Sequence, residues 1–163
     1  MQLPSELAKA AVPYQSIDVP NPLGMVRPSL GDNAGVALYR LLRWVALEDM
    51  IGRGAAGTAY LAGKKLGISL GLDSLDALLQ LCHALKVGVI KVPAATETRV
   101  RVEVFECVTC SGLKPVGRVL CHFEAGLIAG SFTTIFKQKI RAVETQCIGG
   151  LGDDACSFDI ERK

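Results

Sequence analysis

The stretch that decides the fold runs from Cys121 to Cys156 and reads CHFEAGLIAGSFTTIFKQKIRAVETQCIGGLGDDAC. It opens on a cysteine, and the apolar run that follows is typical of a buried helix. An alternating pattern of strand type then carries Glu144, and a glycine-rich loop separates Cys147 from Cys156. The stretch therefore predicts a helix, a strand, a turn and a returning strand, with three thiols and one carboxylate at their ends.

Those four side chains, Cys121, Glu144, Cys147 and Cys156, carry the donor atoms of a four-ligand zinc site. Glu144 and Cys147 would face opposite sides of a continuing strand, so we expect Cys147 to lie already in the turn. The N-terminus of a helix would favour the thiolate of Cys121. Two simpler interpretations fit the same spacing: buried free cysteines with Glu144 on a surface strand, or a disulfide between Cys147 and Cys156.

The composition predicts one ordinary domain. The chain has 163 residues, half of them hydrophobic, yet its longest apolar run, Ala125 to Phe136, is far shorter than the roughly 20 residues that a membrane-spanning helix needs. The N-terminus lacks the basic start and apolar segment of a secretion signal, so we expect a cytoplasmic protein without disulfides. A net charge of +2 with scattered Lys and Arg argues against nucleic acid as a partner.

Residues 1–30 contain five of the seven prolines, which excludes a long helix there. We interpret them as an extended arm with a short helix near Ser5–Ala11 and a short strand around Met25–Arg27. Residues 31–163 form the folded domain in this interpretation.

Hydrophobic periodicity divides the folded domain into helices followed by strands. A first helix over 35–51, capped by Asp32 or Asn33, is apolar nearly all round and should be buried on more than one side. The other helices are expected over 55–67, which is rich in small residues, over 75–86 after a cap at Asp73 or Ser74, and from Cys121 or His122. The expected strands cover 87–92, 98–107, 139–147 and 157–161. This order predicts an α+β fold, a single domain in which helices pack on one face of an antiparallel sheet of four to five strands.

Cys107 and Cys110 form a C-x2-C pair directly after the longest predicted strand. The pair could bind a second metal together with His122, act as a redox pair, or simply make a turn.

The pattern C-x4-G-x3-G…E-x2-C…G-x3-C-x-F resembles that of the 4-vinyl reductase domain family. This family includes archaeal hydrocarbon-binding proteins and the sensor domains of phenol- and xylene-responsive activators. The residues that carry the resemblance are Cys121, Gly126, Gly130, Glu144, Cys147, Gly152, Cys156 and Phe158. The resemblance implies that Cys121, Glu144, Cys147 and Cys156 bind a structural zinc ion. It also implies the fold of nitric-oxide-sensing and Golgi-tethering domains, which are commonly dimeric.

The functional prediction is a small-molecule sensor or binding domain. The sequence contains no recognisable catalytic set, no phosphate loop and no dinucleotide fingerprint, so the residues favour a binding protein over an enzyme and assign no catalytic residue. Many small residues at the expected helix contacts leave room for an apolar or aromatic ligand in a homodimeric protein. The expected pocket residues are Trp44, Tyr60, Phe105, Phe123 and Phe132. The alternatives are an accessory role in tetrapyrrole vinyl reduction and a dimeric scaffold.

Overall fold

The computed structural model describes residues 35–96 and 99–162, together with Arg27 and Ser29. The chain divides into two units, Met1–Asn33 and Ala34–Lys163, and the fold below is that of the second unit. The proline-rich arm predicted for residues 1–30, with its short helix and short strand, lies outside the described residues except for Arg27 and Ser29.

The helical half of this unit opens with three short helical turns in succession, which we call the 36–51 segment. They are α1 (Val36–Arg40), the π-helix η2 (Leu41–Leu47) and α2 (Glu48–Ile51). A 3-10 turn, η3 (Gly52–Gly54), leads into α3 (Ala55–Ser69), and α4 (Leu75–Ala84) follows. Ser74 caps α4 as predicted, because its hydroxyl accepts the Ala77 N–H at 3.3 Å.

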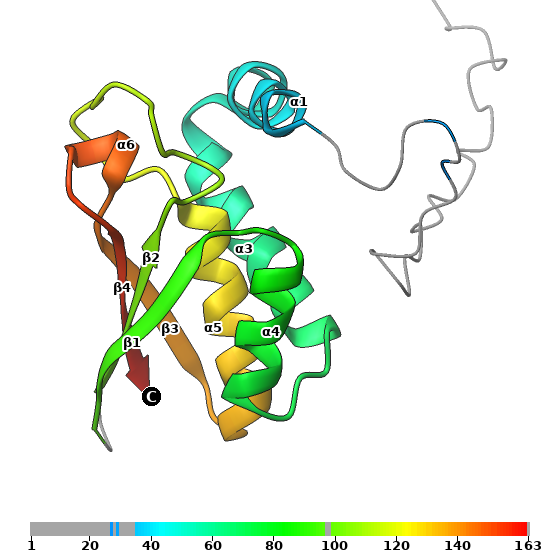
Figure 1. Cartoon of the computed structure of the whole chain (residues 1–163), viewed down its shortest axis with the longest axis vertical. Helices are drawn as coiled ribbons and strands as arrows, with labels where there is room; N and C mark the ends of the chain where they lie inside the picture. Colours follow the sequence, from blue (N-terminus) through cyan, green and yellow to red (C-terminus); the bar gives the residue numbers. More distant parts are fainter. Residues whose placement is uncertain (1–26, 28, 30–34, 97–98, 163) are drawn as a thin grey trace, which may run out of the picture. The chain divides into compact units, whose positions relative to one another are not determined.

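The strands form one antiparallel sheet in the order β1-β2-β4-β3 within the described residues (Figure 1). Their bounds are Val89–Ala95 for β1, Arg99–Phe105 for β2, Ile140–Gln146 for β3 and Cys156–Arg162 for β4. Helix α5 (His122–Phe136) precedes β3, and the single turn α6 (Ile148–Leu151) joins β3 to β4. The predicted α+β fold class is confirmed.

Proline in a strand interior is tolerated where the ladder is already broken, and β1 shows this at Pro93. The β1–β2 register slips between Lys91 and Ala94, so that one extra residue of this edge strand bulges out at Pro93.

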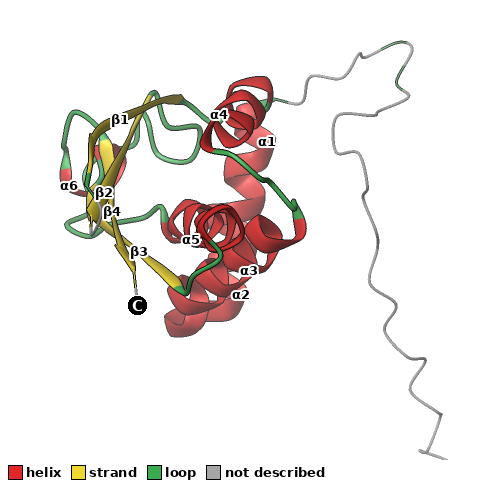
Figure 2. Cartoon of the chain, turned by 90° about the horizontal axis from the view of Figure 1, so that it is seen from below, coloured by secondary structure: helices red, strands yellow, loops and turns green. Residues whose placement is uncertain are grey.

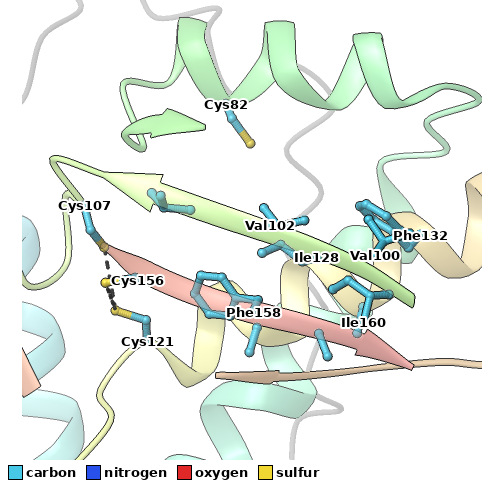
Figure 3. Close-up of a cluster of buried hydrophobic side chains, with 14 of the residues drawn as sticks. Cys82, Val100, Val102, Cys107, Cys121, Ile128, Phe132, Cys156, Phe158 and Ile160 are labelled. Atoms are coloured by element: carbon cyan, nitrogen blue, oxygen red, sulfur yellow. Dashed lines mark hydrogen bonds between the residues drawn. The ribbon is translucent and has the colours of Figure 1, made fainter. Parts of the chain in front are cut away.

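The core lies between the sheet and the helices, which form two layers in Figure 2. Alternate residues of β2 point inward, with Val100, Val102 and Val104 buried as the sequence predicted. Phe158 and Ile160 of β4 meet them across the ladder, and α5 contributes Ile128 and Phe132 (Figure 3).

Helices α3 and α5 touch backbone to backbone through two pairs of glycines. A Cβ added to Gly126 would lie 2.0 Å from the Tyr60 carbonyl oxygen, and one added to Gly63 would lie 2.0 Å from that of Phe123. Gly67 and Gly130 repeat the arrangement one turn further along, at 2.3 and 2.2 Å from backbone oxygens. The small residues noted in both helices therefore permit close packing of α3 on α5.

The expectation that the first helix is buried on more than one side was wrong. Large apolar side chains of the 36–51 segment are exposed, with Leu41 58% and Val45 63% accessible, and none of its residues is buried. Only the stripe bearing Tyr39, Arg43 and Trp44 faces the domain, and it makes polar contacts there. Hydrophobic periodicity indicates how much apolar surface a helix has, but not what covers it.

None of the helices in the described ranges combines the length and the apolar character needed to cross a bilayer.

The substitution Gly126→Ala should destabilise the domain by about 2 kcal/mol or more, because the added methyl group would overlap the backbone of α3. Gly57→Ala, in the same helix pair but with no atom within 4 Å of the new Cβ, should instead stabilise it through helix propensity. Urea unfolding of both variants checks this. Equal midpoints would mean that α3 and α5 are not in close contact.

Candidate functional site

Five of the six cysteines gather at the end of the sheet where β2 finishes and β4 begins, and all five have no accessible surface. Cys107 and Cys110 lie in the turn after β2, Cys121 directly before α5, Cys147 after β3 and Cys156 at the start of β4. Figure 3 shows Cys107, Cys121 and Cys156 converging there, whereas Cys82 lies apart on α4. All six are free thiols, so the alternative of a Cys147–Cys156 disulfide does not hold.

The sulfur atoms are as close as ligands of a common ion. The Sγ–Sγ distances are 3.6 Å for Cys107–Cys121, 3.2 Å for Cys110–Cys156 and 3.8 Å for Cys121–Cys156. Cys110 Sγ lies 3.9 Å from Cys147 Sγ. This buried cysteine cluster could hold a metal ion.

Two sets of four donors fit, each with its ligand atoms within 4.8 Å of one another. One set contains Cys121, Glu144, Cys147 and Cys156, the four residues singled out from the sequence. The other contains Cys107, Cys110, Cys121 and Cys156. The C-x2-C pair thus belongs to the same cluster, while His122 is in neither set and lines a cavity instead.

Glu144 reaches the cluster from β3, where its carboxylate accepts the Cys121 N–H at 2.7 Å through Oε2. Its other oxygen, Oε1, is buried without a hydrogen-bond partner among the described residues. Burial, with the nearby Cys147 as a second cause, raises the pKa of Glu144 to about 9. A buried carboxyl oxygen without a partner is well suited to a metal ligand, because an ion would compensate its lost hydration.

Glycines let the α6 turn close over the cysteines. A Cβ on Gly149 would lie 2.2 Å from the Cys110 carbonyl oxygen, and one on Gly150 would lie 2.9 Å from Cys147 Sγ. The Gly150 carbonyl in turn accepts N–H groups of Val116 and Gly117, both at 2.9 Å. The turn that carries Cys147 is thereby fixed against the turn that carries Cys110.

The 36–51 segment docks on the C-x2-C turn with its polar side chains. Arg40 donates to the carbonyls of Val108 and Ser111 at 2.9 and 2.8 Å. Trp44 Nε1 donates to the Thr109 carbonyl at 3.1 Å. The position of the segment therefore depends on the conformation of the turn that bears Cys107 and Cys110.

Glu124 of α5 forms a buried polar network beneath the segment. Its carboxylate accepts from the Thr109 hydroxyl and from Tyr39, the latter at 3.3 Å, and pairs with Arg43 at 3.4 Å. Burial raises the pKa of Glu124, an effect that Arg43 opposes, and burial is also the main cause that raises the pKa of Tyr39 to about 12.

A mostly apolar cavity of about 300 Å³ lies between the 36–51 segment, the first turns of α3 and the start of α5. Trp44, Ile51, Ala59, Leu120 and Phe123 form its apolar wall. Its polar groups are Arg43, which lies over the Trp44 ring at 4.9 Å, His122, and the ion pair of Glu48 with Arg118. A wider depression beside it shares Trp44, Ala55 and Leu120.

The structure brings together only part of the expected pocket. Trp44 and Phe123 line the cavity, but Tyr60 lies at a separate depression near β3 and Phe105 at another beside β4. Phe132 is fully buried and contacts Phe136 with ring centroids 5.3 Å apart. The alanines of α3, rather than further aromatic residues, open the cavity.

Sequence and structure comparisons identify the family. The family model of the vinyl-4-reductase (V-4-R) domain matches residues 100–162. The uncharacterized protein MJ1642 of Methanocaldococcus jannaschii is 35% identical over 131 residues, which is 80% of this chain and 80% of that protein. This chain belongs to the vinyl-4-reductase domain family.

Solved structures share the fold. A vinyl-4-reductase family protein from Methanocaldococcus jannaschii superposes with a TM-score of 0.62 at 18% identity, covering 80% of this chain and 83% of that one. The phenol-responsive sensory domain of the transcription activator PoxR, solved with phenol, superposes with a TM-score of 0.60 at 15% identity, covering 79% and 75%.

Replacing Arg43 by Met should destabilise the domain by about 3 kcal/mol, because it leaves the buried Glu124 carboxylate without its cation. Adding Glu124→Gln should restore part of that loss. Arg141→Met, which removes a cation from the exposed pair with Glu161, should change stability by less than about 1 kcal/mol. Denaturant unfolding of the four proteins measures the coupling, and a similar small loss in both single Arg variants would contradict it.

Proposed function

We propose that this chain is a binding or sensing domain for a small apolar or aromatic molecule, with a structural zinc site beside the binding cavity. The observation that carries the proposal is the cavity whose apolar wall ends on the strand-to-helix connection containing Cys121. A cavity of about 300 Å³ suits a single-ring molecule, and a few polar groups at an apolar wall are typical of ligand sites.

Zinc suits the donor set of Cys121, Glu144, Cys147 and Cys156. Thiolates with one carboxylate are zinc ligands, and four protein ligands leave no position for a reacting water, so the ion would be structural. The ion would join the end of β3, the start of β4 and the start of α5, the elements from which these side chains come.

The proposed zinc site and the cavity share parts. Leu120 lines the cavity and Cys121 next to it is a cluster residue, while Trp44 both lines the cavity and donates to the C-x2-C turn. A ligand that pushes on Trp44 would therefore shift the 36–51 segment relative to a rigid, metal-bound turn. Such a displacement is the signal that we propose for a sensor. The shared fold with the PoxR domain, which was solved with phenol, supports a ligand of this class.

The ligand proposal predicts that phenol or toluene raises the melting temperature. At 100 times its Kd a ligand adds about 2.7 kcal/mol of stability, which corresponds to roughly 5 °C or more for a domain of this size. Ala59→Leu should abolish the shift by filling the cavity, whereas Lys65→Leu, on the same helix but outside the cavity, should keep it.

A panel of apolar and aromatic compounds that shifts neither the wild type nor the Lys65→Leu protein would argue against the ligand proposal. A shift that persists unchanged in Ala59→Leu would place the binding elsewhere.

We further propose that the chain acts as a homodimer through the 36–51 segment. Its exposed apolar side chains form a continuous helical face, and a face of this kind favours association. The large exposed ones are Leu38, Leu41, Leu42, Val45, Leu47 and Met50.

Light scattering should give twice the chain mass of 17.3 kDa for the wild type and the single mass for Leu41→Glu/Val45→Glu. Leu61→Glu places the same charge on an equally exposed leucine of α3 and should leave the dimer intact. A monomeric wild type at micromolar concentration would contradict the dimer proposal.

A further inference from the structure

The C-x2-C pair brings the number of donors around the cluster to six, two more than one zinc ion takes. The two donor sets share Cys121 and Cys156 and differ in their other members. We propose that the cluster holds two divalent metal ions. One is bound by Cys107, Cys110, Cys121 and Cys156, and the other by Cys121, Glu144, Cys147 and Cys156, so that the thiolates of Cys121 and Cys156 bridge them. This inference rests on the zinc site proposed above and extends it.

The number of donors matches two ions and exceeds one. Two four-coordinate ions have about eight positions to fill. Cys107, Cys110, Glu144 and Cys147 would each fill one, and the two bridging cysteines would each fill two. Neither ion would then lack a ligand, and no thiol of the cluster would be left without a metal.

The distances agree with this arrangement. Zinc–sulfur bonds of about 2.3 Å at tetrahedral angles place sulfur atoms about 3.8 Å apart. The bridging pair Cys121–Cys156 is separated by 3.8 Å, and Cys107 and Cys110 lie 3.6 and 3.5 Å from Cys121. Cys110 also lies 3.9 Å from Cys147 of the second set, so the two sets are in direct contact. Sulfur atoms this close leave no space between them for the inorganic sulfide of an iron–sulfur cluster.

Charge favours the second ion as well. Five thiolates and one carboxylate carry six negative charges in a cluster whose cysteines have no accessible surface. A single divalent ion would leave four of those charges uncompensated, while two ions leave two, and buried uncompensated charge is strongly unfavourable. With a single ion at the C-x2-C set, the buried Oε1 of Glu144 would also stay without a partner.

The C-x2-C turn is built as rigidly as the rest of the site. The Cys107 carbonyl accepts the N–H groups of Cys110 and Ser111 at 3.2 and 3.0 Å, which folds the turn on itself. Gly149 packs on one side of the turn, and the 36–51 segment binds its carbonyls on the other. The second ion would therefore attach the 36–51 segment, one wall of the cavity, to the metal centre.

Native mass spectrometry and elemental analysis of zinc-loaded, desalted protein test the inference directly. Two zinc ions per chain are expected for the wild type and for the control Cys82→Ala, whose cysteine lies outside the cluster. Cys107→Ser/Cys110→Ser and Glu144→Gln/Cys147→Ser should each retain one. One zinc in the wild type would overturn the two-ion site and leave the single structural zinc standing. No zinc, or iron with acid-labile sulfide, would overturn both.

A cobalt(II) titration of the wild type keeps the test valid if the double variants do not fold. Two equivalents should bind with the absorption of tetrahedral thiolate coordination. The electron paramagnetic resonance signal should grow with the first equivalent and fall with the second, because bridging thiolates couple the two spins. A signal that grows in proportion to both equivalents would overturn the shared thiolates.

Discussion

The rest of the structure depends on the convergence of five buried thiols and one carboxylate at one end of the sheet. These side chains come from the turn after β2, the residue before α5, strand β3, the turn after it and the start of β4. Thiols alone contribute little packing to such a small volume, and the pKa of Cys82, raised to about 11 by burial, shows how an isolated buried thiol stays neutral. An ion bound by the cluster would turn a set of weak contacts into a covalent-like link between distant parts of the chain.

The second constraint is the contact between α3 and α5, where glycines replace side chains and the backbones meet. Further toward the N-terminus of α3 the glycines give way to alanines, and the helices and the 36–51 segment leave the cavity between them. Arg43 connects the two regions, because it pairs with the buried Glu124 and also lies over the Trp44 ring. The cavity, the polar network and the metal cluster are therefore parts of one continuous arrangement.

The sequence predicted the strands, the α+β class and the position of Cys121 before α5, because alternation and glycine-rich turns are local signals. It also grouped Cys121, Glu144, Cys147 and Cys156, which the structure brings together, although their binding of zinc stays a proposal. It did not place Cys107 and Cys110 in that group, since only the tertiary fold returns the end of β2 to the start of β4. Nor could it foresee the polar docking of the 36–51 segment or the separation of Tyr60, Phe105 and Phe132 from the cavity, because these depend on which helix face meets which neighbour.

The most direct test of a fold held together by metal is the melting temperature of the metal-loaded protein before and after treatment with a strong chelator, followed by addition of zinc. Because the ion would join five segments of one domain, we predict a fall of well over about 10 °C on chelation, reversed by stoichiometric zinc. A melting temperature that chelation leaves unchanged, in protein verified to have been metal-loaded beforehand, would contradict this role of the cysteine cluster.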